Sequence, residues 1–110
     1  SSDLPIPGAI EDLVQIVGGD VRVARYALPG SPQLGSNVVA ALAGRNGALL
    51  ANHGVVGVAS DLKQVLIICQ IIEKSAQIVI AAQGVGGVVE LPQEDIDFMR
   101  DFFLHKYGQR

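Results

Sequence analysis

The spacing of apolar residues predicts a helix and then a strand in the first part of the chain. The helix opens at Pro7, a residue that suits a first helical turn, and closes at Gly18-Gly19. VRVA at 21–24 alternates as a short strand does. Within the helix, apolar residues three and four positions apart form one face: Ile10, Leu13, Val14 and Val17.

A turn and a second helix are predicted next. Ser31 is placed to accept a hydrogen bond from an early backbone N–H of this helix, and Pro32 suits its first position. Gly44 would end the helix. Its apolar face comprises Leu34, Val38, Ala41 and Leu42.

Two short apolar strands and a long helix follow. ALLA at 48–51 and VVGVA at 55–59 are joined through Asn52-His53-Gly54, a connection typical of a hairpin. Ser60 is predicted to cap a helix that runs to about Gln83. This helix is apolar on almost every side and therefore requires burial on more than one face, by another subunit or by polypeptide outside these residues.

The last part of the chain completes the predicted order. The glycine-rich segment at 84–87 follows a helix instead of preceding one, so we interpret it as a connector and not as a phosphate loop. Pro92 opens a final helix, whose charged ends match the helix dipole. Helix, strand, helix, strand, strand, helix, helix indicates an α/β or α+β fold with a mixed or antiparallel sheet. The charged residues at the two helix ends are Glu94, Asp95, His105 and Lys106.

Composition narrows the class of protein. A chain of 110 residues forms one domain at most, and 49% hydrophobic residues with 5% aromatics indicate a core of Val, Ile, Leu and Ala. A net charge of −3, with eight scattered Lys and Arg residues, argues against a nucleic-acid partner. The single cysteine, Cys69, excludes an internal disulfide and is expected to be a small core residue in a reducing cytoplasm.

The apolar run at 62–82 raises the question of a membrane span. Lys63, Glu73 and Lys74 interrupt the run, which favours a buried helix or a helix at a subunit contact. The first ten residues lack the basic region of a signal peptide. We therefore expect a cytoplasmic protein without a membrane partner.

Few residues are candidates for chemistry. A catalytic zinc takes three protein ligands, and none of the spacings HxH, HExxH or CxxC occurs in the chain. His53 alone is read on local grounds as the middle of a turn, with a metal-ligand role left open. Tyr107 is either a frayed terminal aromatic residue or a phenol that reaches a site and transfers a proton.

A family resemblance is carried by the segment ALLANHGVVGVASDLKQVLIICQIIEKSAQI at 48–78. It resembles the C-terminal half of the zinc-dependent class II aldolase and adducin-head family, and the resemblance extends over nearly the whole chain. Its most specific parts are Asn52-His53-Gly54, the helix with Glu73 and Ala76, and the pattern that begins at Tyr26. The resemblance implies half of an αβα layered fold with a mainly antiparallel sheet. Residues 1–110 would form the C-terminal portion of a single domain, with its N-terminal half absent.

The resemblance also implies roles for individual residues. His53 matches the third histidine ligand of the family's catalytic zinc, and another divalent cation is possible there. Tyr107 matches a tyrosine that acts on the aldehyde portion of the substrate. A second family tyrosine falls near Glu11 or Asp12, which makes Asp12 an alternative proton donor. The family's phosphate loops, general-base glutamate and other two histidine ligands belong to its first half.

The function implied by the resemblance is zinc-dependent aldol cleavage of a phosphorylated sugar, as in L-fuculose-phosphate aldolases. Pentulose-phosphate 4-epimerases and decarboxylases of the family share the metal site and stay as alternatives. A non-catalytic, adducin-like oligomerisation scaffold and a small independent oligomerising domain are two further alternatives. Family enzymes are homotetramers, so we expect a homo-oligomer. The chain by itself is expected to be inactive, because one histidine cannot hold a catalytic zinc.

Overall fold

The computed structural model describes residues 4–105 of the chain. Within that range it has four helices and three strands in the order that the sequence predicts. Their bounds are α1 Glu11–Val17, β1 Val23–Ala24, α2 Pro32–Leu42, β2 Gly47–Leu50, β3 Gly54–Gly57, α3 Leu62–Gln83 and α4 Gln93–His105.

Helix α1 starts later than the sequence predicts. It begins at Glu11 and not at Pro7, because Ile10 is extended and the Gly8 carbonyl accepts the N–H of Leu91 at 2.9 Å. Ile6 and Val21 form an isolated antiparallel bridge, with N–H to O distances of 3.0 and 2.9 Å in the two directions. The bridge at Ile6 and the bond at Gly8 thus join the segment before α1 to distant parts of the chain in a non-helical conformation. The predicted end is confirmed, since Gly18 adopts a left-handed conformation and its N–H bonds to the Val14 carbonyl.

The N-caps of the next two helices were predicted with different success. Ser31 caps α2 as expected, since its Oγ accepts the N–H of Leu34 at 3.3 Å. Ser60 as the cap of α3 is wrong, because Asp61 takes that position and its Oδ1 accepts the N–H of Gln64 at 2.8 Å. Both residue types are good caps, and an anionic oxygen makes the stronger bond to the positive end of a helix.

The three strands form one mixed sheet in the order β1, β2, β3. The β1–β2 pair is parallel and short, and the β2–β3 pair is antiparallel over four residue pairs, from Gly47 opposite Gly57 to Leu50 opposite Gly54. The predicted hairpin is therefore confirmed, with its strands one or two residues earlier than expected. The predicted first strand at 21–24 keeps its regular pairing only at 23–24.

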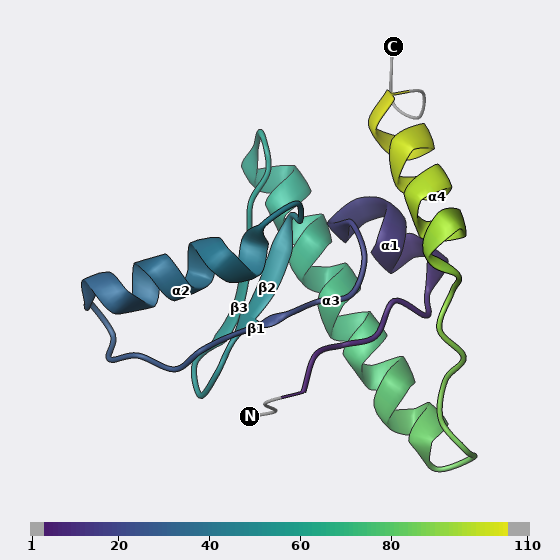
Figure 1. Cartoon of the computed structure of the whole chain (residues 1–110), viewed down its shortest axis with the longest axis horizontal. Coiled ribbons are helices and arrows are strands. Elements are labelled where there is room, and N and C mark those ends of the chain that lie inside the picture. Colours follow the sequence, from purple (N-terminus) through teal and green to yellow (C-terminus); the bar gives the residue numbers. More distant parts are fainter. Residues whose placement is uncertain (1–3, 106–110) are drawn as a thin grey trace.

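Helices lie on both faces of the sheet, which gives the expected αβα layers (Figure 1). On one face α2 packs against the sheet around three small residues, Ala24, Ala41 and Ala48. On the other face Leu49 joins the larger core that α1 and α3 build. The buried side chains of that core are Ile6, Leu13, Val17, Val21, Ile68, Ile72 and Val79.

Helix α3 is buried along only one stripe. Its buried residues face α1 and the sheet, whereas Leu62, Leu66 and Ile80 are 86%, 58% and 69% exposed. By length and composition alone, α3 is also the one helix among residues 4–105 that could cross a membrane. Its packed stripe is that of a core helix, and its remaining apolar surface is uncovered in this chain.

Gly47 provides a test of the contact between β2 and α3. A Cβ atom at this position would lie 2.5 Å from Ile72 Cδ1 and 3.3 Å from Ile68 Cγ2. We expect Gly47→Ala to lower the free energy of unfolding by about 1–3 kcal/mol, the usual cost of overpacking a core. Gly54→Ala is the matched control, since nothing lies within 4 Å of a Cβ there. Urea unfolding of both variants measures the difference, and equal effects would contradict the close contact.

Candidate functional site

His53 lies in the turn that joins β2 to β3. Its backbone N–H bonds to the Leu50 carbonyl at 3.0 Å, and its side chain is exposed. Asn52 before it has a φ of 62°, the one positive φ of a non-glycine residue in the described part of the chain. Asparagine is among the few residues that adopt this conformation readily. The local interpretation of the segment as a turn is therefore confirmed.

The same turn lines a groove of about 770 Å³. The groove lies between the extended segment at 4–6, the β2–β3 turn and one side of α3. Its polar residues are Asn52, His53, Glu73 and Gln83, and Cys69 adds a thiol. Its apolar lining comprises Leu4, Pro5, Ile6, Leu49, Leu50, Val55, Ile72, Ala76, Val79 and Ile80.

The structure brings some of the candidate residues together. His53 lines the groove with Glu73 and Ala76, both from the motif on α3 that carried the family resemblance. Asp12 is not among the lining residues, and its Oδ2 accepts a hydrogen bond from Lys74 Nζ at 3.1 Å. Tyr107 falls outside the described residues.

The residues present do not make a complete metal site. No group of three or more His, Cys, Asp or Glu side chains between residues 4 and 105 is placed to hold a metal ion. A catalytic zinc needs three protein ligands and keeps a fourth position for water or substrate. His53 is therefore one donor for such an ion at most, and the described residues alone do not fit it.

The other residues assigned structural roles have mixed outcomes. Cys69 was expected in the core, but it is half-buried next to β3 and lines the groove, and its thiol is free of a disulfide. His105 Nε2 lies 3.3 Å from Asp101 Oδ1 on the exposed surface of α4. The connector between α3 and α4 includes Gly86 and Gly87, both with positive φ.

Arg100, which no sequence pattern singled out, joins α4 to α1 and to the segment before β2. Arg100 on α4 is half-buried and donates from Nη1 to the carbonyls of Gln15 and Ile16, at 2.7 and 3.0 Å. Its Nη2 donates to Asn46 Oδ1. Burial lowers the pKa of the Arg100 guanidinium, and the nearby Arg45 cation lowers it further. Its position four residues after the buried Ile96 is the one local signal that it faces the interior.

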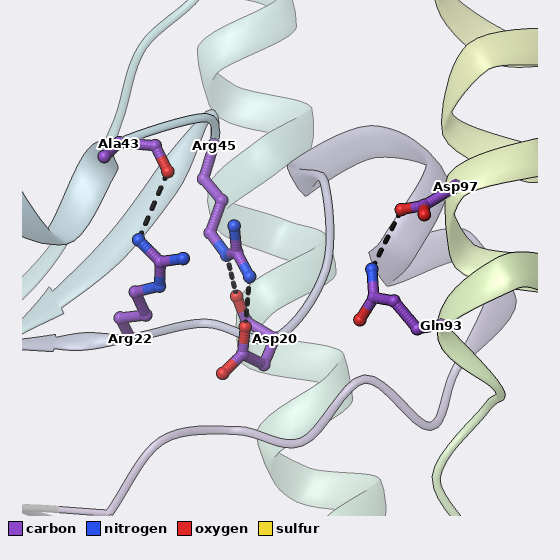
Figure 2. A network of polar contacts seen from close by, with 6 residues as sticks. All are labelled: Asp20, Arg22, Ala43, Arg45, Gln93 and Asp97. Atoms are coloured by element: carbon purple, nitrogen blue, oxygen red, sulfur yellow. Dashed lines mark hydrogen bonds and ion pairs between the residues drawn. The ribbon is translucent and has the colours of Figure 1, made fainter.

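A second arginine, Arg45, bonds to the segment that follows α1 (Figure 2). Arg45 donates from Nε to the Asp20 carbonyl at 2.8 Å and from Nη2 to Asp20 Oδ1 at 2.5 Å. Arg22 donates to the Ala43 carbonyl at 3.2 Å. These bonds join the segment between α1 and β1 to the segment between α2 and β2.

Comparisons with known sequences agree with this architecture. The sequence profile described as "Class II Aldolase and Adducin N-terminal domain" matches residues 2–80. The 5-deoxy-D-ribulose 1-phosphate aldolase of Bacillus thuringiensis is 30% identical over 102 residues, which cover 93% of this chain and 47% of that protein. The 5-methylthioribulose-1-phosphate/5-deoxyribulose-1-phosphate aldolase of Rhodospirillum rubrum is 35% identical over 74 residues, covering 66% of this chain and 33% of that protein.

Solved structures give the same result. An L-fuculose 1-phosphate aldolase superposes with a TM-score of 0.87 at 35% identity, over 93% of this chain and 48% of the other. The YgbL protein of Escherichia coli superposes with a TM-score of 0.71 at 24% identity, over 91% of this chain and 47% of the other, and supports the fold alone.

The chain thus spans about half the length of the proteins that match almost all of it. The profile match covers most of the sequence, including the His53 turn and the helix that carries Glu73. The superposition extends the likeness to the layered arrangement of the sheet and helices. The chain belongs to the class II aldolase and adducin family.

Proposed function

We propose that this chain contributes part of the active site of a class II aldolase that cleaves a phosphorylated sugar. The observation that carries the proposal is the position of His53 in the lining of a groove that is otherwise largely apolar. Both curated relatives and the L-fuculose 1-phosphate aldolase structure are named as aldolases of sugar phosphates, which supports this class of substrate.

His53 is the one metal ligand that we assign to the chain. Its backbone is fixed by the bond to Leu50, so the imidazole is presented by a defined turn and not by a loose loop. A bound zinc, or another divalent cation, would supply Lewis-acid polarisation of substrate oxygens. The remaining ligands would come from the part of the relatives' length that this chain does not span.

Two residues of the chain are proposed for proton transfer to the aldehyde oxygen. Tyr107 is the first, because a phenol can donate and accept a proton at that point. Asp12 is the alternative, and it would first have to leave its ion pair with Lys74. That requirement makes Tyr107 the better candidate.

A scaffold role without catalysis, as in adducin, is the second candidate. It is favoured by the uncovered apolar side chains of α3, which are suited to a subunit contact or to further polypeptide of the kind that the relatives have. We further propose a cytoplasmic homo-oligomer, a tetramer as in family enzymes. The aldolase role ranks first over the scaffold, epimerase and decarboxylase roles, because the relatives at 30% identity or more bear aldolase names.

Metal content tests whether the ligand set is incomplete. After incubation with zinc and removal of the excess, we expect the 110-residue chain to retain far less than one zinc per molecule, since one imidazole is too few ligands. His53→Ala should leave this low value unchanged, as should the control His105→Ala. One zinc per chain, lost in His53→Ala, would contradict the proposed incomplete site.

The aldolase role is tested on the complete gene product, recovered by sequencing around this segment. We expect it to cleave L-fuculose 1-phosphate or 5-deoxyribulose 1-phosphate, and His53→Ala to lower kcat/KM by more than the roughly 10–100-fold cost of losing an outer-shell partner. Tyr107→Phe should lower kcat by about 10²–10⁴-fold, the value of general acid catalysis.

Matched variants complete that experiment. Asp12→Asn should leave kcat nearly unchanged, and a loss there in place of the Tyr107→Phe loss would make Asp12 the proton donor. His105→Ala controls for loss of a surface imidazole. A complete protein that assembles into oligomers but cleaves no sugar phosphate would support the scaffold role instead.

A further inference from the structure

A second hollow lies away from the His53 groove and shares none of its lining residues. This hollow, which we call the Arg100 cleft, has a volume of about 520 Å³ and lies between α4, the start of α3 and the end of α1. Arg100, Asn46, Ser60 and Gln64 provide its polar side. Ile67, Ile68, Phe103 and Leu104 are its principal apolar residues.

The charge of Arg100 is not neutralised by any carboxylate in the described part of the chain. The nearby Asp20 is engaged by Arg45 (Figure 2). Asp101, on the same helix, pairs with His105. Arg45 and Asp20 thus pair with each other, and Arg100 has no ion pair with a carboxylate among residues 4–105. A half-buried cation without an anionic partner is electrostatically costly. The lowered pKa of Arg100, caused by burial and by Arg45, reflects the same cost.

Hydrogen-bond donors remain available on the polar side of the cleft. The three bonds from Arg100 leave two of its five N–H groups without an acceptor among residues 4–105. Ser60 donates its hydroxyl to Gln64 Oε1 at 3.2 Å, a bond that does not use the amide N–H groups of Gln64. A guanidinium and an amide that line the same hollow are suited to a carboxylate, whose oxygens accept several hydrogen bonds.

We propose that the Arg100 cleft binds a small organic carboxylate with a short apolar tail. The carboxylate would pair with Arg100 and supply the negative charge that Arg100 lacks, while the tail would lie against Ile67 and Leu104. Inorganic phosphate is a poorer match, because the rest of the cleft offers it apolar walls in place of donors. This site is independent of the aldolase proposal, since the two hollows have no residue in common.

The test is a titration of the 110-residue chain with sodium hexanoate, followed by heteronuclear NMR and calorimetry. We expect saturable shifts at the backbone amides of Ser60 and Gln64 and at the side chain of Arg100. Hexanol, which keeps the tail but lacks the charge, should bind about tenfold more weakly or worse, as loss of a charged hydrogen bond predicts. Inorganic phosphate should not saturate the same signals.

Variants assign the effect to the cleft. Arg100→Met should weaken hexanoate binding by about tenfold or more, and Arg22→Met, which removes an arginine outside the cleft, should not. Because Arg100 also caps the last turn of α1, Leu104→Trp serves as a second variant: Leu104 is 51% exposed, and the larger ring would occupy the space for the tail. It should weaken hexanoate binding and leave the fold intact by circular dichroism.

Several outcomes would overturn the proposal. Equal affinity for hexanoate and hexanol would make the cleft a merely apolar surface. Phosphate binding as tight as hexanoate binding, at the same residues, would remove the role of the tail. Absence of saturable shifts, or shifts that persist in both cleft variants, would show that Arg100 serves only to cap α1.

Discussion

The geometry of the groove depends on the close contact between β2 and α3. At Gly47 the strand approaches so closely that a single methyl group would collide with Ile72. From this contact β2 runs outward to the turn that carries His53, while α3 runs beside it and supplies the other wall of the groove. The distance between the His53 imidazole and α3 therefore depends on Gly47, which has no side chain to hold the strand away from the helix.

The sequence predicted which helices and strands form, and in which order, better than it predicted the residues at which they begin. Local spacing was sufficient for α2, with its Ser31 cap, and for the end of α3. It failed at the start of α1, because the residues before Glu11 bond to distant parts of the chain, Ile6 to Val21 and Gly8 to Leu91. It also chose Ser60 over Asp61, two adjacent residues that both suit a cap.

In the candidate site, too, local features were predicted and features that depend on distant residues were not. A turn at His53 follows from local residues, whereas a metal role for it comes only from likeness to a family. Local reasoning had no means to find Arg100, because its acceptors lie 54 to 85 positions away and its importance comes from packing. Asp12 looked chemically useful in the sequence, and the fold brings Lys74 to it from across 62 positions. Charged groups whose partners are distant in sequence are those that pattern analysis assigns least well.

The left-handed backbone of Asn52 has a consequence for how this site can change during evolution. Few residue types tolerate that φ, so substitutions at position 52 are restricted by geometry, whereas position 53 is an ordinary exposed residue that many side chains can occupy. Descendants that abandon the present chemistry can therefore replace the imidazole and still retain the bend that displayed it. A relative that keeps asparagine or glycine at position 52 but has another residue at position 53 would then be one that lost the reaction and kept the turn.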